Sequence, residues 1–137
     1  MNQKKCLLVL LVLLLAEYSF SQLPVRLTSQ VIQLKNNLRF TLQVPASYKI
    51  AVAAEGLNRP RFFTKSPDGR LFVTDMYDRT DNKKGRVYIL ENWNASTHKF
   101  DKLTTFMDNL HNPNQVGFYT VGNQSYIYIA ETHQLSY

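Results

Sequence analysis

The sequence predicts an all-β chain that forms about two blades of an incomplete β-propeller. Apolar and polar residues alternate with a period of two, as half-buried strands require. Tight-turn signals such as Asp68-Gly69 separate these runs. The whole pattern recurs after about fifty residues, which is the spacing typical of propeller blades. Because a propeller closes with roughly four to eight blades, we expect the chain to be the N-terminal part of a longer protein or a truncated product.

The repeat is carried by two pairs of segments. The bend at 56–60 (GLNRP) is matched 53 residues later by 109–113 (NLHNP). The strand at 71–75 (LFVTD) is matched 56 residues later by 127–131 (IYIAE), so the second copy has three additional residues. Each copy therefore places a proline-containing bend before its strands and a carboxylate at the end of a strand.

The N-terminus has the organisation of a secretory signal peptide. A positive head precedes the apolar run 6–16, and small residues follow at Ser19 and Ser21. We expect cleavage after Ser21, giving a signal peptide over 1–21 and a secreted or periplasmic protein without a membrane span; an uncleaved anchor is the alternative. The single cysteine, Cys6, lies in this segment, so the mature chain would have no disulfide or thiolate chemistry.

Residues 22–44 form an N-terminal extension with alternating apolar residues, which predicts one or two strands. One role for them is to close the ring by pairing with the last blade, which would cover an exposed sheet edge. The blades occupy 45–137. Within them we expect strands on both sides of the 56–60 bend, the first over 48–54, and further strands over 71–75, 85–90 and 99–107.

The net charge of +6 comes from basic residues that are scattered along the chain. Nucleic-acid-binding proteins concentrate basic residues on one face or in one run. A solvated surface is the better interpretation, so we expect no nucleic-acid partner.

Three segments resemble the first blades of the glucose/sorbosone dehydrogenase family, and the sorbosone-dehydrogenase-like branch in particular. They are GLNRPRFFTKSPDGRLFVTD, GRVYILE and LHNPNQVGFYTVGNQSYIYIAETHQL, and the resemblance covers 45–137. Members are secreted six-bladed propellers that depend on pyrroloquinoline quinone (PQQ). The resemblance implies oxidation of a sugar or sugar aldehyde, PQQ and calcium as candidate cofactors, and a cytochrome as candidate electron acceptor. In the glucose-oxidising members the base and most quinone-binding residues lie in later blades, whose motifs this sequence lacks.

Candidate site residues follow from the position of ligands at the mouth of a propeller channel, past the ends of the inner strands. His133 is the candidate catalytic base. Glu131, Asp75, Asn114 and Gln115 are the candidate cofactor-binding residues. The alternative is that His133 is a hydrogen-bonded structural histidine and that both carboxylates bind backbone N–H groups.

No metal site is expected, because no two histidines have a ligand spacing in the sequence and no acidic cluster resembles a calcium loop. His98 and His111 are expected to face solvent. Two other functions stay open. One is a non-catalytic propeller that serves as a binding module. The other is a calcium-dependent hydrolase propeller of the gluconolactonase and strictosidine-synthase type, in which Asp75, Glu131 and Asn114 would be ligands.

Overall fold

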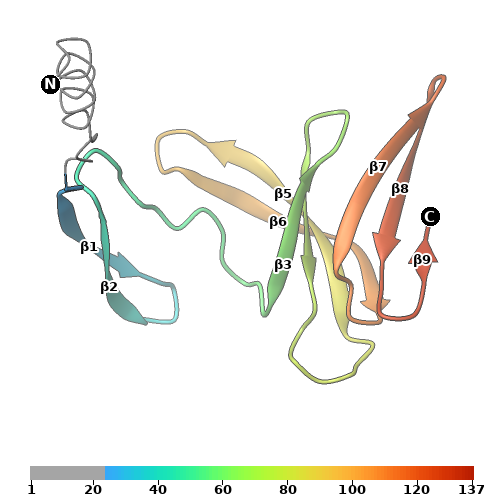
Figure 1. Ribbon diagram of the computed structural model, residues 1–137, viewed down its shortest axis with the longest axis horizontal. Helices are drawn as coiled ribbons and strands as arrows, with labels where there is room; N and C mark the ends of the chain where they lie inside the picture. Colours follow the sequence, from blue (N-terminus) through green and yellow to red (C-terminus); the bar gives the residue numbers. More distant parts are fainter. Residues whose placement is uncertain (1–23) are drawn as a thin grey trace, which may run out of the picture.

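The computed structural model describes residues 24–137, and these form nine strands and no helix. The predicted signal peptide lies outside the described residues. The strands make three antiparallel sheets that follow one another along the long axis of the molecule (Figure 1). Among the described residues, no helix is long and apolar enough to cross a membrane. The all-β prediction is therefore confirmed.

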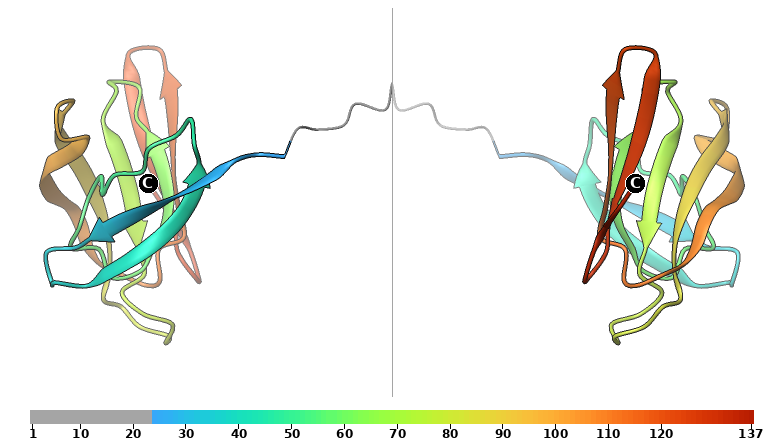
Figure 2. Two further views of the ribbon diagram at one scale, coloured as in Figure 1. Left: turned by 90° about the vertical axis from the view of Figure 1, so that its left-hand side faces the viewer. Right: turned by 90° about the vertical axis from the view of Figure 1, so that its right-hand side faces the viewer.

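The first sheet, here the hairpin sheet, pairs β1 (Leu27–Gln33) with β2 (Arg39–Pro45). Of the one or two strands expected in the N-terminal extension, two are present, and they pair with each other. The hairpin sheet lies at one end of the molecule, facing the viewer in the left panel of Figure 2. The segment 46–57 connects the hairpin sheet to the central sheet. The Gln30 side chain anchors this segment to the hairpin sheet by hydrogen bonds with the backbone of Tyr48 and Ile50.

The second sheet, here the central sheet, is a four-stranded meander in the order β3-β4-β5-β6. Its strands are β3 (Pro60–Lys65), β4 (Leu71–Asp75), β5 (Gly85–Asn94) and β6 (Lys99–Leu110). The predicted Asp68-Gly69 turn joins β3 to β4, with Gly69 at φ +90°, a backbone conformation that glycine adopts without steric cost.

The third sheet, here the C-terminal sheet, contains β7 (Gln115–Val121), β8 (Gln124–Ala130) and β9 (Leu135–Ser136) in that order. It packs on one face of the central sheet, and it faces the viewer in the right panel of Figure 2. The apolar core between the two sheets comes from alternate positions of their strands: Phe72, Val87, Ile89, Leu110, Val116 and Ile129.

The opposite face of the central sheet is covered by the segment that precedes it. Val73, Tyr88 and Leu90 point to this side, and Ala54 and Leu57 pack against them. The strand expected over 48–54 is absent, and this expectation is wrong. The segment lies beside β6 without a strand ladder, and Phe100 N–H donates to the Ala53 carbonyl at 2.8 Å. The apolar residues of this segment, such as Ala54 and Leu57, therefore pack on the central sheet although the segment itself is not a strand.

The strands bring related segments to the same end of the molecule. The bends 56–60 and 111–114, the loop 76–84 and the segment 131–134 all lie at one end of the central and C-terminal sheets, at the bottom of Figure 1. We call this the bend end. The turns 66–70 and 122–123 lie at the other end, here the turn end.

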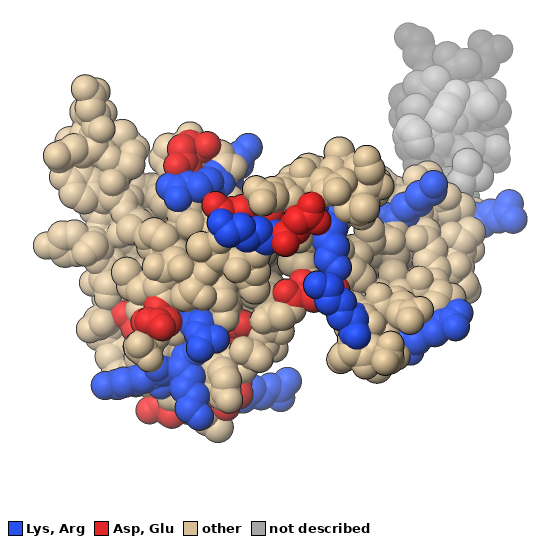
Figure 3. Space-filling model, turned by 180° about the vertical axis from the view of Figure 1, so that it is seen from behind, with Lys and Arg blue, Asp and Glu red and all other residues tan. Residues whose placement is uncertain are grey.

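Charged side chains are distributed over the surface. On the face drawn in Figure 3, basic and acidic side chains lie interspersed, with uncharged surface between them.

Candidate functional site

The two carboxylates of the sequence repeat hold the bends at the bend end. Asp75, the last residue of β4, is 2% exposed. Its oxygens accept hydrogen bonds from the backbone N–H groups of Asn58 and Arg59, each at 2.7 Å, and of Tyr77 at 3.0 Å. Asp75 thus fixes the bend that leads into β3.

Glu131 makes the corresponding contact in the C-terminal sheet. It follows β8, and its Oε2 accepts a hydrogen bond from the His111 backbone N–H at 2.6 Å. In the repeat, His111 corresponds to Asn58 at an offset of 53 residues, and Glu131 corresponds to Asp75 at an offset of 56. The hydrogen bond between the carboxylate and the bend is therefore the same in both copies. The bends share a further detail, because Gly56 and its counterpart Asn109 both have positive φ, 89° and 57°. Such angles favour glycine and are tolerated by asparagine.

The second oxygen of Glu131 is also occupied. Oε1 accepts hydrogen bonds from Gln134 Nε2 at 2.8 Å and Ser136 Oγ at 2.9 Å. Partial burial raises the pKa of Glu131, but the hydrogen bonds from Gln134, the His111 amide and Ser136 outweigh it and lower the pKa below its ordinary value. The carboxylate is therefore ionised at neutral pH, and both of its oxygens accept hydrogen bonds from other groups of the protein.

Three loops place a second group of polar side chains beside Glu131. His111 lies in the bend before β7, His133 in the segment after β8, and Asp81 in the loop between β4 and β5. His111 Nε2 contacts Asp81 Oδ1, and the rings of His111 and His133 meet edge-on with centroids 4.4 Å apart. One potential ligand atom from each of the three residues lies within 4.8 Å of the others.

The electrostatics of this group favour an ionised Asp81. The hydrogen bond with His111 is the main cause that lowers the pKa of Asp81; burial opposes it, and the nearby His111, His133 and Lys83 add to the lowering. Exposure differs between the partners, since the Asp81 side chain is 74% exposed and that of His111 only 15%.

Two expectations from the sequence are corrected here. His111 is largely covered, so it does not face solvent as expected. The ligand-spacing argument against a metal site also fails, because it considered only neighbours in the sequence. Residues 81, 111 and 133 are separated by 30 and 22 positions and meet because three loops share the bend end. No linear motif could have revealed this group; only the pairing of the strands brings it together.

A pocket of 240 Å³ opens beside this group, lined by Lys83, Asn109, His111, Glu131, His133 and Gln134. It contains two of the predicted site residues, His133 and Glu131. Its size is below the roughly 300–1,000 Å³ of typical cofactor pockets. PQQ is anionic, and the ionised Glu131 and Asp81 here oppose an anion. The described residues therefore do not by themselves fit a complete quinone. Calcium fits poorly as well, because it prefers oxygen ligands and two of the three grouped side chains offer nitrogen.

The other predicted site residues lie outside this pocket. The Asn114 side chain is exposed, and its Oδ1 accepts hydrogen bonds from the Arg61 guanidinium at 3.3 and 3.4 Å. Its backbone ties the two sheets together, since Thr74 Oγ1 donates to the Asn114 carbonyl at 2.9 Å. Gln115 begins β7 and is exposed. The 240 Å³ pocket is therefore lined by His133 and Glu131 but not by Asn114 or Gln115, although the Asn114 N–H donates to the carbonyl of Ala130, the residue before Glu131.

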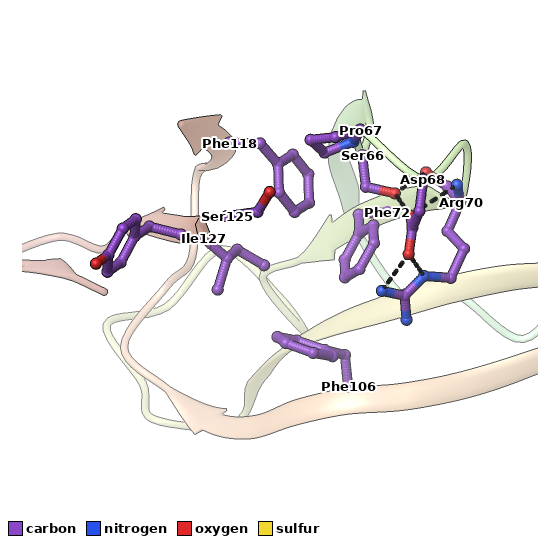
Figure 4. A pocket seen from close by; sticks show the side chains of 10 residues that line it. Ser66, Pro67, Asp68, Arg70, Phe72, Phe106, Phe118, Ser125 and Ile127 are labelled. Atoms are coloured by element: carbon purple, nitrogen blue, oxygen red, sulfur yellow. Dashed lines mark hydrogen bonds and ion pairs between the residues drawn. The ribbon is translucent and has the colours of Figure 1, made fainter. Parts of the chain in front are cut away.

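A second pocket, of 290 Å³, lies at the turn end between the central and C-terminal sheets (Figure 4). Phe72 is its centre and contacts Phe106 and Phe118 edge-on, with centroids 5.2 and 5.0 Å apart. The ion pair of Arg70 with Asp68 closes one side. Sequence reasoning did not identify this pocket, because alternating aromatic residues in strands equally predict a filled core.

Comparison with known proteins gives one family. No curated protein and no solved structure matches the chain. The model of the family described as Domain of unknown function (DUF7133) matches residues 35–133, which run from the β1–β2 turn to His133. This range includes both carboxylate-held bends and the group at the bend end. The chain therefore belongs to the DUF7133 family.

Proposed function

We propose that this chain forms consecutive blades of a β-propeller that acts as a secreted, quinone-dependent dehydrogenase of the glucose/sorbosone dehydrogenase type. The observation that carries the proposal is the structural repeat. A four-stranded antiparallel meander is the unit of a propeller blade. Here the central sheet is one such unit, and β7 to β9 begin a second with the same bend, strand pair and carboxylate.

The proposed site lies at the bend end, where both units terminate their second strands. Propellers bind ligands at the mouth of the channel, and residues just past the strand ends reach that mouth. His133 is exposed there and is the proposed base that takes a proton from the substrate hydroxyl. Glu131 positions the segment that carries His133 by holding Gln134 and the facing bend.

The described residues supply only part of such a site. Two units do not close a ring, and the pocket beside His133 is small and has two ionised carboxylates nearby. In this proposal, most groups that bind the quinone and the remaining blades of a six-bladed ring lie outside the described residues. PQQ, when bound, would accept the hydride; the role of this chain is to bind and orient the substrate and to accept its proton at His133.

A non-catalytic propeller that binds a partner is the second candidate. One observation favours it: both oxygens of Asp75 and both of Glu131 are bonded within the protein. The same observation argues against the calcium-dependent hydrolase, which would use these oxygens as calcium ligands.

The test uses the protein as its own cells assemble it. With PQQ and calcium added, we expect an aldose or sugar aldehyde, from a panel, to drive reduction of a redox dye. His133→Gln should abolish this reduction, and His98→Gln, a change of the same kind in the exposed β5–β6 turn, should leave it unchanged. Failure of every sugar to reduce the dye would overturn the proposal. Lactone hydrolysis with calcium alone would do the same and would support the hydrolase.

A further inference from the structure

We propose that Asp81, His111 and His133 form a binding site for one divalent first-row transition-metal ion, with zinc as the best-matched ion. Their three ligand atoms lie within 4.8 Å of one another. Ligand atoms around a tetrahedral zinc ion, each at about 2.0–2.2 Å from the metal, lie roughly 3.4 Å apart. Small side-chain rotations would close the remaining difference. The inference does not depend on the dehydrogenase proposal, and the two are mutually exclusive at His133, because an imidazole nitrogen bound to the ion cannot also accept the substrate proton.

The donor set matches this class of metal. Two imidazole nitrogens and one carboxylate oxygen are ligands that zinc accepts in sites with three protein ligands, where water occupies the fourth position. Imidazole also suits copper, nickel and iron, while magnesium and calcium prefer oxygen alone. The contact between His111 Nε2 and Asp81 Oδ1 shows that an imidazole nitrogen and this carboxylate already lie side by side.

The backbone around each ligand is fixed by bonds that do not involve the ligand atoms. Asn112 Nδ2 donates to the Thr80 carbonyl at 3.1 Å, which ties the loop of Asp81 to the bend of His111. Thr132 N–H donates to the His111 carbonyl at 3.1 Å, which ties that bend to the segment of His133. Glu131 adds its bond to the His111 N–H. Such outer contacts hold metal ligands in place and strengthen metal binding.

The proposed metal would join three loops that come from both sheets. Asp81 lies between two strands of the central sheet, His133 between two strands of the C-terminal sheet, and His111 on the connection between the sheets. Its open coordination position would face the 240 Å³ pocket. We therefore expect the ion to stabilise the packing of the two sheets.

The first test measures zinc binding to the untagged full chain by isothermal titration calorimetry with zinc chloride. We expect one zinc ion per chain. His111→Gln, His133→Gln and Asp81→Asn should each weaken binding by at least about tenfold, because even the loss of an outer partner costs 10–100-fold. The matched controls are His98→Gln and Asp101→Asn, which change exposed residues outside the group and should bind as the wild type does.

A second measurement needs no variant and remains informative if a variant fails to fold. Diethyl pyrocarbonate modifies histidines, and mass spectrometry of the peptides locates the modified residues. Zinc should protect His111 and His133 and leave the reactivity of His98 unchanged. The proposal is overturned if the wild type binds no zinc at millimolar concentration. It is equally overturned if binding depends on His98, or if zinc protects all three histidines alike.

Discussion

Gly85 is the position at which the structure makes its sharpest steric prediction. It is the first residue of β5, it is buried, and it pairs with Leu110 at the end of β6. A Cβ atom at this position would lie 2.1 Å from Cδ and 2.8 Å from Cγ of Pro113, and 2.9 Å from the Leu110 carbonyl oxygen. The absence of a side chain here allows the bend before β7 to pack directly on the start of β5.

Gly85→Ala should therefore destabilise the protein. Restoring an ordinary contact of 3.4 Å requires the Pro113 ring to retreat by about 1.3 Å, the difference from the 2.1 Å approach. The ring is rigid and fully buried, so the backbone of the bend must move with it. Overpacking of this kind costs typically 1–3 kcal/mol, and we expect about 3 kcal/mol here. Because the same bend carries His111, the variant should also weaken the zinc binding proposed above.

Urea unfolding followed by circular dichroism measures this loss. Gly117→Ala is the matched control, since a Cβ atom there meets nothing within 4 Å and the backbone angle is not positive. The control should change the free energy of unfolding by less than about 0.5 kcal/mol. If Gly85→Ala is as stable as Gly117→Ala, Pro113 does not pack on the start of β5 and the described bend is wrong.

Three further predictions concern the carboxylates and the core. Asp75→Ala leaves three backbone N–H groups without their acceptor and should lower the free energy of unfolding by about 3 kcal/mol in urea; a loss under about 1 kcal/mol would contradict the contacts described. The side chains of Arg70 and Ser66 lower the pKa of Asp68 from its ordinary 3.8 to about 2. The ionised carboxylate therefore stabilises the fold above about pH 4, and this stabilisation is lost as the pH falls from about 4 to 2. Acid titration of stability in wild type and Asp68→Asn should therefore converge below pH 2, and parallel curves would refute the ion pair. Phe72→Ala should cost about 3–5 kcal/mol in the same urea assay, because Phe72 is 1% exposed between two aromatic rings; a cost below about 1 kcal/mol would show that the two sheets do not pack at this ring.

Local chemistry made several parts of this fold predictable. The Asp68-Gly69 turn, β4 and the start of β5 follow from turn residues and period-two alternation. The match of Asp75 with Glu131 also followed from the repeat, and the alternative that both bind backbone N–H groups describes the contacts observed. The turn and the strands depend on neighbours in the sequence, and the carboxylate match depends on the repeat.

The features that were missed depend on contacts between distant segments. Residues 48–54 alternate like a strand but form no strand ladder; the segment lies along the outer edge of β6, where the Phe100 N–H donates to the Ala53 carbonyl. His111 is covered and faces Asp81 and His133 only because three loops meet at the bend end. The spacing of these residues in the sequence does not predict that contact.

The central claim is that the two sheets are repeats of one unit, each held by a carboxylate that binds the bend before its first strand. Amide hydrogen exchange measured by NMR tests it most directly, because the N–H groups of Arg59 and His111 donate to Asp75 and Glu131 and lie outside the strands. Both amides should exchange far more slowly than those of the exposed β5–β6 turn. Of these two amides, Asp75→Ala should release only that of Arg59, and Glu131→Ala only that of His111. Rapid exchange of either amide in the wild-type protein would contradict the claim.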